Sequence, residues 1–480
     1  MEKDKRNPWS VRKKMGILST AITLVVVCCL ALLNLAAAVI TDRYPVKWDL
    51  TANQAFQLSQ NSIDYLEGMQ KEVTITVLNT RDGFLEGGDY YRQAMAVLEQ
   101  YAQYNRQIHL EFVDLMANPA YIANYPDLEL AVNDLLISCG ENLEQLTVYD
   151  LFEVQYSWYG GAISASNVEQ AVTGAILNVS TDQKKQLVFV TGHQESDASG
   201  MRQLLERNGF EAQEVSTLLE ELPQEADLVV LYAPHRDLTV DETEKLDAYL
   251  ENGGNYGKNI LYFAAVDQPE LPNLSAWLAK WGMAVGTGAV AETSPSRVLN
   301  SNGYFGIAEI AAQPFQAGMQ DPQIPLAMPF SRPVEFLYEE SLGRTTTTLL
   351  SYSETAGVAG EDVEQISDIV PSGPIAVAGM STYTAENGAE SNLLVFGSDQ
   401  LFSSQMLGIR ALSNADYLMA VGNTLTHREG TFFLPSKTLG GQPLMINQAQ
   451  ALLLATVLMV VLPVVVLAVG IVIWMRRRRA

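Results

Sequence analysis

Residues 226–265 read ADLVVLYAPHRDLTVDETEKLDAYLENGGNYGKNILYFAA, and the fold class that we expect follows from this stretch. It opens with a short apolar run that is typical of a buried strand, and it closes with a second such run. Between them lies a helix signature, because Thr239 is a suitable N-cap and Asp241 and Glu242 place acidic residues in the first turn. A strand, a helix and a strand in this order indicate a parallel sheet.

The same alternation continues on both sides of this stretch. LVFV at residues 187–190 is another apolar strand, and residues 71–113 contain a strand, a helix and a strand. The fold class that we predict is α/β, with two or three units whose sheets are mainly parallel and doubly wound. The expected units are an N-terminal α/β unit at 41–160, a Rossmann-like central unit at 161–290, and a C-terminal part at 291–450 that completes the central sheet.

Two long stretches, 15–40 and 451–475, carry no charged residue. Each exceeds the roughly 20 apolar residues that a helix needs to cross a bilayer. Basic residues flank both, in the tails 1–14 and 476–480, and such residues stay on the cytoplasmic side. We therefore expect a two-pass protein of the cell membrane with both termini in the cytoplasm and residues 41–450 outside. Small residues at the end of the first stretch leave its cleavage as a signal peptide open.

The region between these stretches is strongly acidic. Residues 41–450 hold 20 Lys and Arg against 53 Asp and Glu, a net charge of −33. A nucleic-acid-binding protein needs clustered Lys and Arg, so we expect no nucleic-acid partner. The apolar fraction of 48 % argues against a disordered chain. Cys139 is the one cysteine of this region, so it has no partner for an internal disulfide.

The most site-like residues are Gly192, His193 and Glu195, which directly follow an apolar strand. Ligands of α/β folds bind at the carboxyl ends of such strands, and Glu195 could orient the titratable ring of His193. The alternative is a structural turn, in which Gly192 permits the bend and His193 caps a backbone group. Asp399 follows a later strand, where it either lines the same crevice or caps the next helix.

Signals for catalysis are weak. Class I amidotransferases pair His-x-Glu with a cysteine nucleophile, but Cys139 stands in ISCGE, without the small residues of a nucleophile elbow. GNYGKN at residues 254–259 lacks the spacing of a phosphate loop, and no metal-ligand spacing such as HExxH occurs. We therefore expect a protein that is not an enzyme, with no catalytic residues, metal or cofactor.

Four segments, in order, carry a resemblance to a known family. They are YPVKWDLTANQAFQLS (44–59), VFVTGHQE (188–195), the strand, helix and glycine pair of 226–254, and VFGSDQLF (395–402) with NADYLMAVGNTLT (414–426). Together they resemble the auxiliary proteins of gliding-motility-type ABC transporters (GldG-like). The sequence departs from that family at Gln194, where glycine is usual.

The resemblance implies an extracytoplasmic auxiliary component of an ABC transport system, with an amidotransferase-like α/β fold and a domain related to an intraflagellar-transport subunit. Its partners would be an ABC permease and a cytoplasmic ABC ATPase, as separate chains. Two alternatives are open. One is a solute- or glycan-binding module, for which Trp158, Tyr159 and Tyr232 are candidate aromatic residues. The other is a degenerate hydrolase- or amidotransferase-like enzyme that depends on His193.

Overall fold

The computed structural model describes residues 54–157, 160–181, 184–299, 302–311, 313–360, 365–409, 411–428, 434 and 436–439. The chain divides into two compact units, Met1–Gln54 and Ala55–Ala480, and nearly all described residues belong to the second. Among these described residues, no helix combines the length and the apolar character that crossing a bilayer requires. The stretches 15–40 and 451–475, for which we expect membrane helices, lie outside the described residues.

The first sheet has four strands in the order β2-β1-β3-β4. The strands are β1 (Val73–Val77), β2 (Ile108–Phe112), β3 (Leu135–Cys139) and β4 (Asn142–Leu146). β1 and β2 are parallel and are joined through α4 (Asp89–Tyr104), which confirms the expected strand, helix and strand. α4 buries Ala94, Leu98 and Tyr101 on one side, because their spacing places them on one face of a helix. β3 and β4 complete the sheet in antiparallel fashion.

Helix α6 (Val168–Ser180) packs against the first sheet. Its buried residues Val172 and Ile176 share a hydrophobic cluster with β1 and α4. The core of the N-terminal part therefore extends to about residue 180, past the expected boundary at 160. The remaining elements here are α2 (Gln60–Gly68), α3 (Arg81–Leu85), η1 (Pro119–Asn124), α5 (Val148–Leu151), β5 (Phe152–Ser157) and β6 (Gly160–Ser166).

The second sheet has ten strands, and one half of it is parallel. That half runs β8-β7-β9-β10-β20, with bounds Phe210–Ser216, Lys185–Thr191, Leu228–Tyr232, Asn259–Phe263 and Glu390–Phe396. Every residue of β9 and β10 is buried, as the apolar runs of the sequence predict for strands that are covered on both faces.

The other half of the large sheet is antiparallel, so the expectation of mainly parallel sheets was wrong there. It continues from β20 through β19 (Ile375–Thr384), β17 (Arg344–Tyr352), β13 (Ile307–Ile310) and β14 (Leu326–Ala327), while β16 (Glu340–Ser341) pairs with β17. The physical reason lies in the connections. Only short turns join β16 to β17 and β19 to β20, and a short turn returns the chain in the opposite direction.

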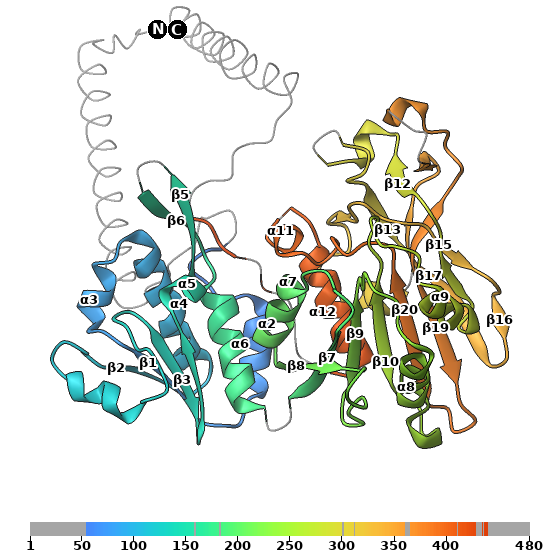
Figure 1. Cartoon of the computed structure of the whole chain (residues 1–480). Coiled ribbons are helices and arrows are strands. Elements are labelled where there is room, and N and C mark those ends of the chain that lie inside the picture. The colour runs from blue at the N-terminus through green and yellow to red at the C-terminus, as the bar shows by residue number, and fades with distance from the viewer. Residues whose placement is uncertain are drawn as a thin grey trace, which may run out of the picture. The chain divides into compact units, whose positions relative to one another are not determined.

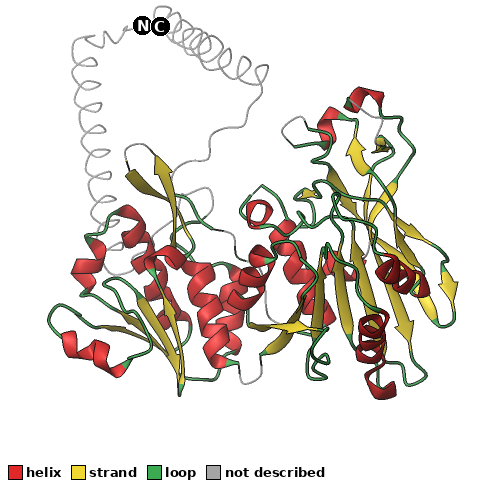
Figure 2. Ribbon diagram, viewed as in Figure 1, coloured by secondary structure: helices red, strands yellow, loops and turns green. Residues whose placement is uncertain are grey.

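Helices cover both faces of the parallel half (Figures 1 and 2). Neighbouring residues Val188 and Phe189 of β7 point to opposite faces and enter different hydrophobic clusters. Phe189 shares its cluster with α7 (Ser199–Arg207) and α12 (Asn414–Leu425), and Val188 shares its own with α8 (Val240–Glu251) and α9 (Pro272–Lys280). Smaller elements are η2 (Asn252–Gly254), β11 (Met283–Val285), β12 (Ala289–Glu292), η3 (Pro295–Arg297), α10 (Gln313–Ala317), β15 (Val334–Phe336), β18 (Ala356–Ala359), η4 (Ile366–Asp368) and α11 (Ser404–Leu407).

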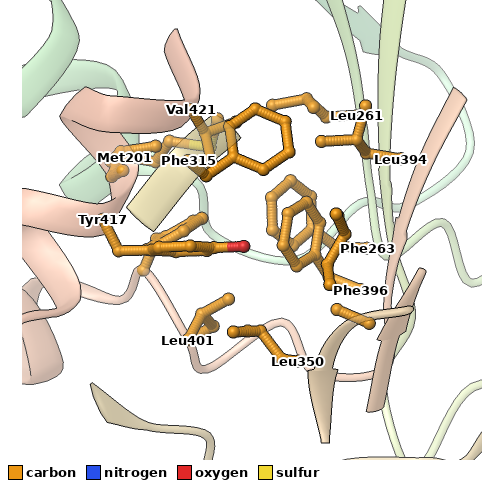
Figure 3. Packing of buried hydrophobic residues seen from close by; sticks show 14 of the residues in the cluster. Met201, Leu261, Phe263, Phe315, Leu350, Leu394, Phe396, Leu401, Tyr417 and Val421 are labelled. Atoms are coloured by element: carbon orange, nitrogen blue, oxygen red, sulfur yellow. The ribbon is translucent and has the colours of Figure 1, made fainter. Parts of the chain in front are cut away.

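Aromatic rings fill the core beneath α12 (Figure 3). The rings of Phe263 on β10 and Phe396 on β20 stack with centroids 4.9 Å apart, and Phe402 meets both of them edge-on. All three side chains are fully buried. The junction between β10 and β20 is therefore packed by rings as well as by the ladder of hydrogen bonds.

We expect Phe263→Ala to lower the free energy of unfolding by about 3–5 kcal/mol, because it leaves a cavity between two rings. Urea unfolding of the purified chain, followed by tryptophan fluorescence, measures the loss. Val370→Ala is the control, since Val370 is 79 % exposed and should change stability very little. Equal effects of the two substitutions would contradict the described packing.

Candidate functional site

The strands β7 and β9 are parallel neighbours at which the order of strands along the sheet reverses (Figure 1). From β7 the chain passes through α7 to β8 on one side, and from β9 it passes through α8 to β10 on the other. The chain therefore leaves these two strands toward opposite ends of the sheet. The space between the loops that follow them is the usual ligand position in open α/β sheets. Gly192 and His193 follow β7 at this position.

Backbone hydrogen bonds join the turn after β7 to the turn after β9. The carbonyl oxygen of His193 accepts hydrogen bonds from the N–H groups of His235 and Arg236, at 2.8 and 2.9 Å. Gly192 has a φ of +111°, which glycine adopts without strain, whereas Gln194 holds a left-handed φ of +56°. The turn expected at Gly192 is thus present, and hydrogen bonds join it to the turn after β9.

The imidazole of His193 lies between two carboxylates and is only 1 % exposed. Its Nε2 is 3.1 Å from Oε1 of Glu242, and its Nδ1 is 3.4 Å from Oε1 of Glu195. The same Glu195 oxygen accepts the backbone N–H of His193 at 2.9 Å. Glu195 therefore contacts His193 as the sequence indicated, while Glu242 is a partner that sequence reasoning missed.

Glu242 is itself held from two sides. As the third residue of α8 it accepts the N–H and the hydroxyl of Thr239, both at 2.9 Å, in a capping box. The hydroxyl of Thr217, just after β8, donates to its other oxygen at 2.6 Å. The N-cap at Thr239 was predicted from the sequence, but the contact of Glu242 with His193, 49 residues away, had no local signal.

The surroundings of His193, Glu195 and Glu242 favour the charged form of each side chain. The carboxylate of Glu195 raises the pKa of His193 against the opposing effect of burial, and Glu242 adds to the rise. Burial is the largest single effect on the carboxyls of Glu195 and Glu242 and opposes their ionisation, but the hydrogen bonds and the charge of His193 around each of them together outweigh burial and lower the pKa. The two carboxylates thus favour protonation of His193, and the ring of His193 favours ionisation of both carboxyls.

Both ring nitrogens of His193 lie beside carboxylates of the same chain. Nε2 is within hydrogen-bonding distance of Glu242, whereas Nδ1 makes no hydrogen bond with the described residues. Cys139 lies on β3 of the four-stranded sheet and packs against that sheet's hydrophobic cluster. Among the described residues, no contact joins Cys139 to His193, so the triad of Cys139, His193 and Glu195 is not assembled.

Asp399 is partly buried, and its backbone carbonyl accepts the hydroxyl of Tyr232 at 2.5 Å. It does not cap α11, because the N-cap is Ser403, whose side chain accepts the N–H of Met406. That expectation was wrong. No contact among the described residues brings the Asp399 side chain to His193 or Glu195.

Of the three aromatic residues expected around a ligand, Tyr232 is the one that lies within the described residues. Tyr232 is 2 % exposed and packs in the core, with its ring centroid 4.7 Å from that of Phe263. Trp158 and Tyr159 lie outside the described residues. A hollow of about 200 Å³ lies elsewhere, lined by α6, α7 and α11, and none of the candidate site residues lines it. Within the described part of the chain, no group of three or more His, Cys, Asp and Glu could hold a metal.

Residues 52–149 match a family described as a domain of unknown function, DUF7088. This match spans the four-stranded sheet and covers about a fifth of the chain. None of the curated proteins matches the sequence. The resemblance to the gliding-motility-type family therefore stays a prediction.

Several solved structures are similar to part of the chain. The mmIFT52 N-terminal domain is 17 % identical, with a TM-score of 0.39, and the match covers 51 % of this chain and 99 % of that one. PurLQS from Thermotoga maritima is 16 % identical over 51 % and 99 % of the two chains, with a TM-score of 0.28. A GMP synthase subunit from Thermoplasma acidophilum is 10 % identical over 51 % and 94 %, with a TM-score of 0.26.

We expect the free energy of unfolding to fall as pH rises above about 6.5, the ordinary value for histidine, through the raised pKa of His193. The folded chain binds this proton more tightly than the unfolded chain, so the stabilisation is complete below that range and is lost above it. Below about pH 4.3 stability should fall again through the lowered pKa values of Glu195 and Glu242.

His193→Gln should remove most of the loss on the alkaline side, as measured by urea unfolding between pH 5 and pH 9. His109→Gln is the control, because the side chain of His109 is 45 % exposed and its ion pair is with Glu72, which is exposed as well. If His193→Gln kept the wild-type profile, the ionic cluster would not be formed in solution.

Proposed function

We propose that the chain is a membrane-anchored, non-catalytic auxiliary subunit of an ABC-type transport system. In this proposal it assembles with a separate permease and a separate cytoplasmic ATPase, and residues 41–450 lie outside the cell membrane. The fold would be the amidotransferase-like α/β fold of the gliding-motility-type family, flanked by one transmembrane helix at each end. The observation that carries the proposal is the contact between the two ends of the folded region.

The two ends meet at the carboxylate of Glu169, on α6. Lys437, near the last described residue, places its Nζ 2.6 Å from Oε2 of Glu169, and the two side chains are only 12 % and 5 % exposed. The other oxygen of Glu169 accepts the N–H of Ser59 and the hydroxyl of Ser62, both at 2.6 Å. One buried carboxylate thus ties the beginning of the described chain to its end.

Backbone contacts support the same junction. Ser166 and Lys437 exchange two N–H to carbonyl hydrogen bonds of 2.7 Å, and the Nζ of Lys437 also donates to the carbonyl of Gln57. Residue 55 follows the first long apolar stretch, and residue 439 precedes the second. Two helices in one membrane would have to leave the folded region on the same side. The contact between its two chain ends is what such an arrangement requires.

The environment of His193 supports the non-catalytic part of the proposal. Both of its ring nitrogens serve an internal ion pair, and the ring is almost completely buried. A general base or acid has to come within hydrogen-bonding distance of a substrate, which this ring does not offer. Its role is the fastening of β7, β8 and α8.

We expect affinity purification of the full-length chain from its native membrane, in mild detergent, to recover an ABC ATPase and a polytopic permease in a fixed ratio. Identification and quantification of the co-purifying chains is the measurement. Recovery of this chain alone, in several detergents and after mild cross-linking, would sink the proposal. Ligand screens on the protein would then be the next step.

We expect Glu169→Gln to lower the free energy of unfolding by about 3–5 kcal/mol, because it leaves the ammonium of Lys437 buried without its counter-charge. Urea unfolding of the purified full-length chain measures this. Glu214→Gln is the matched control, since Glu214 pairs with Arg202 at the surface and is 59 % exposed, so its loss should be much smaller. Similar losses for the two variants would show that the ends are not joined through Glu169.

A further inference from the structure

The hollow of about 200 Å³ that α6, α7 and α11 line lies where elements of both hydrophobic cores come together (Figure 1). Asn167 and Gln170 line it from the start of α6, which packs against the first sheet. Gln203 of α7 and Ala415 of α12 line it from the helices that cover the large sheet. His193 is not part of its lining, so the hollow is separate from the cluster at the end of β7.

Five uncharged polar side chains line this hollow, and within the described residues none of them makes a side-chain hydrogen bond. They are Asn167, Gln170, Gln203, Ser404 and Ser436. Asn167 is the N-cap of α6, where asparagine usually accepts an N–H of the first turn, yet its side chain makes no such bond. The donors and acceptors of these five side chains are therefore available to a bound molecule.

The hollow also has an apolar floor, made by Leu204, Leu412 and Ala415. All three side chains are buried. They are aliphatic, and no aromatic ring occurs among the described residues that line the hollow. The flat face of a sugar ring is matched best by an aromatic ring, whereas this floor suits a branched aliphatic group. In a small-molecule site such a floor supplies affinity, and the few polar groups around it fix the orientation of the ligand.

Charge and size limit the ligand further. The guanidinium of Arg207, which also lines the hollow, already pairs with Asp150 at 3.1 Å. An anionic ligand would compete with Asp150 and would enter a region of net charge −33, so it is disfavoured. The volume of about 200 Å³ lies below the roughly 300–1,000 Å³ of pockets for drug-sized ligands. It therefore suits one small residue with its flanking groups.

The walls of the hollow are held in place by two close approaches of helices. A Cβ atom on Gly174 of α6 would lie 2.4 Å from the carbonyl oxygen of Arg207, at the end of α7. A Cβ atom on Gly200 of α7 would lie 2.4 Å from the backbone nitrogen of Ser404, on α11. The three helices thus touch without intervening side chains at these positions. A site that is formed before the ligand arrives loses less entropy on binding.

We propose that this hollow binds a short, uncharged peptide segment, with one branched aliphatic side chain on the floor of Leu204, Leu412 and Ala415. The carboxamides of Gln170 and Gln203 bond the peptide groups beside that residue. A carboxamide carries both an N–H donor and a carbonyl acceptor, as a peptide group does, so the two can bond each other in both directions. The inference goes beyond the proposed function and does not rest on it.

The test is a ligand-observed NMR titration of the full-length chain in detergent, with empty micelles as the blank. The probes are two blocked peptides, acetyl-Ala-Leu-Ala-amide and acetyl-Ala-Gly-Ala-amide. We expect a Kd of about 1 mM or tighter for the leucine peptide. The glycine peptide should bind about tenfold more weakly, because it lacks the group that the floor covers.

Gln170→Ala and Gln203→Ala should each weaken binding of the leucine peptide about fivefold, the effect of losing roughly one hydrogen bond. Both glutamines lie on helices and bond nothing within the described residues, so alanine should leave the melting temperature unchanged or higher. Gln103→Ala is the matched control, because Gln103 is an exposed residue of α4 that does not line the hollow. It should bind the peptide as the unaltered chain does.

No binding of the leucine peptide below about 10 mM, equal affinities for the two peptides, or unchanged affinity in both glutamine variants would overturn the inference. Tighter binding of Ala-Leu-Ala with free, charged ends would overturn the choice of an uncharged segment. Binding of N-acetylglucosamine in place of the peptide would show a sugar site and would overturn it as well. All these outcomes leave the proposed function standing, since that is tested by recovery of the permease and the ATPase.

Discussion

Strands β9 and β10 bury all of their residues, and the layout of the central region depends on this burial. A strand that is apolar on both faces needs cover on both faces, since neither face can stay in contact with water. α7 and α12 supply that cover on one side, and α8 and α9 supply it on the other. The parallel order follows from the same requirement, because each helix that crosses over the sheet returns the chain to start the next strand in the same direction.

Beyond β20 the strands have less need of cover on both faces, and the sheet becomes antiparallel. Along β17 the residues Arg344–Thr348 alternate between exposed and half-buried positions, so this part of the strand has a face that water can reach. Such a face needs no helical cover, and the short turns between β16 and β17 and between β19 and β20 return the chain in the opposite direction. Further along β17 the residues Leu349, Leu350 and Tyr352 are buried and join the hydrophobic cluster of the parallel half, so both halves share one core.

Basic side chains are scarce in the acidic region of residues 41–450, and two of them are buried in ion pairs that join distant segments. His193 fastens the exits of β7 and β8 to the start of α8 through Glu242 and Thr217. Lys437 fastens the end of the described chain to its beginning through Glu169. Buried pairs of this kind add little net stability, because desolvation offsets much of the attraction, but each strongly disfavours arrangements that separate its partners. Their contribution here is the choice of which segments lie together.

The local features of the fold could be predicted from the sequence. The helix of residues 89–104, the cap at Thr239 and the buried strands of residues 226–265 are all as expected, because periodicity and capping depend on neighbours within a few residues. The glycine turn at Gly192 and its closeness to Glu195 were readable for the same reason. The antiparallel half, the addition of α6 to the first core and the capping of α11 by Ser403 were not predicted. They depend on pairings between residues far apart, for which one sequence carries no signal.

The sequence by itself determined the apolar runs, the amphipathic helices, the charge of the region and the position of His193 at the end of a strand. Only the tertiary structure decided whether that histidine would face a ligand or a carboxylate of its own chain. It brought Glu242 to the ring from 49 residues away. The physical reason is that burial and the pairing of charges are properties of the assembled packing, whereas propensity and periodicity are properties of the local chain.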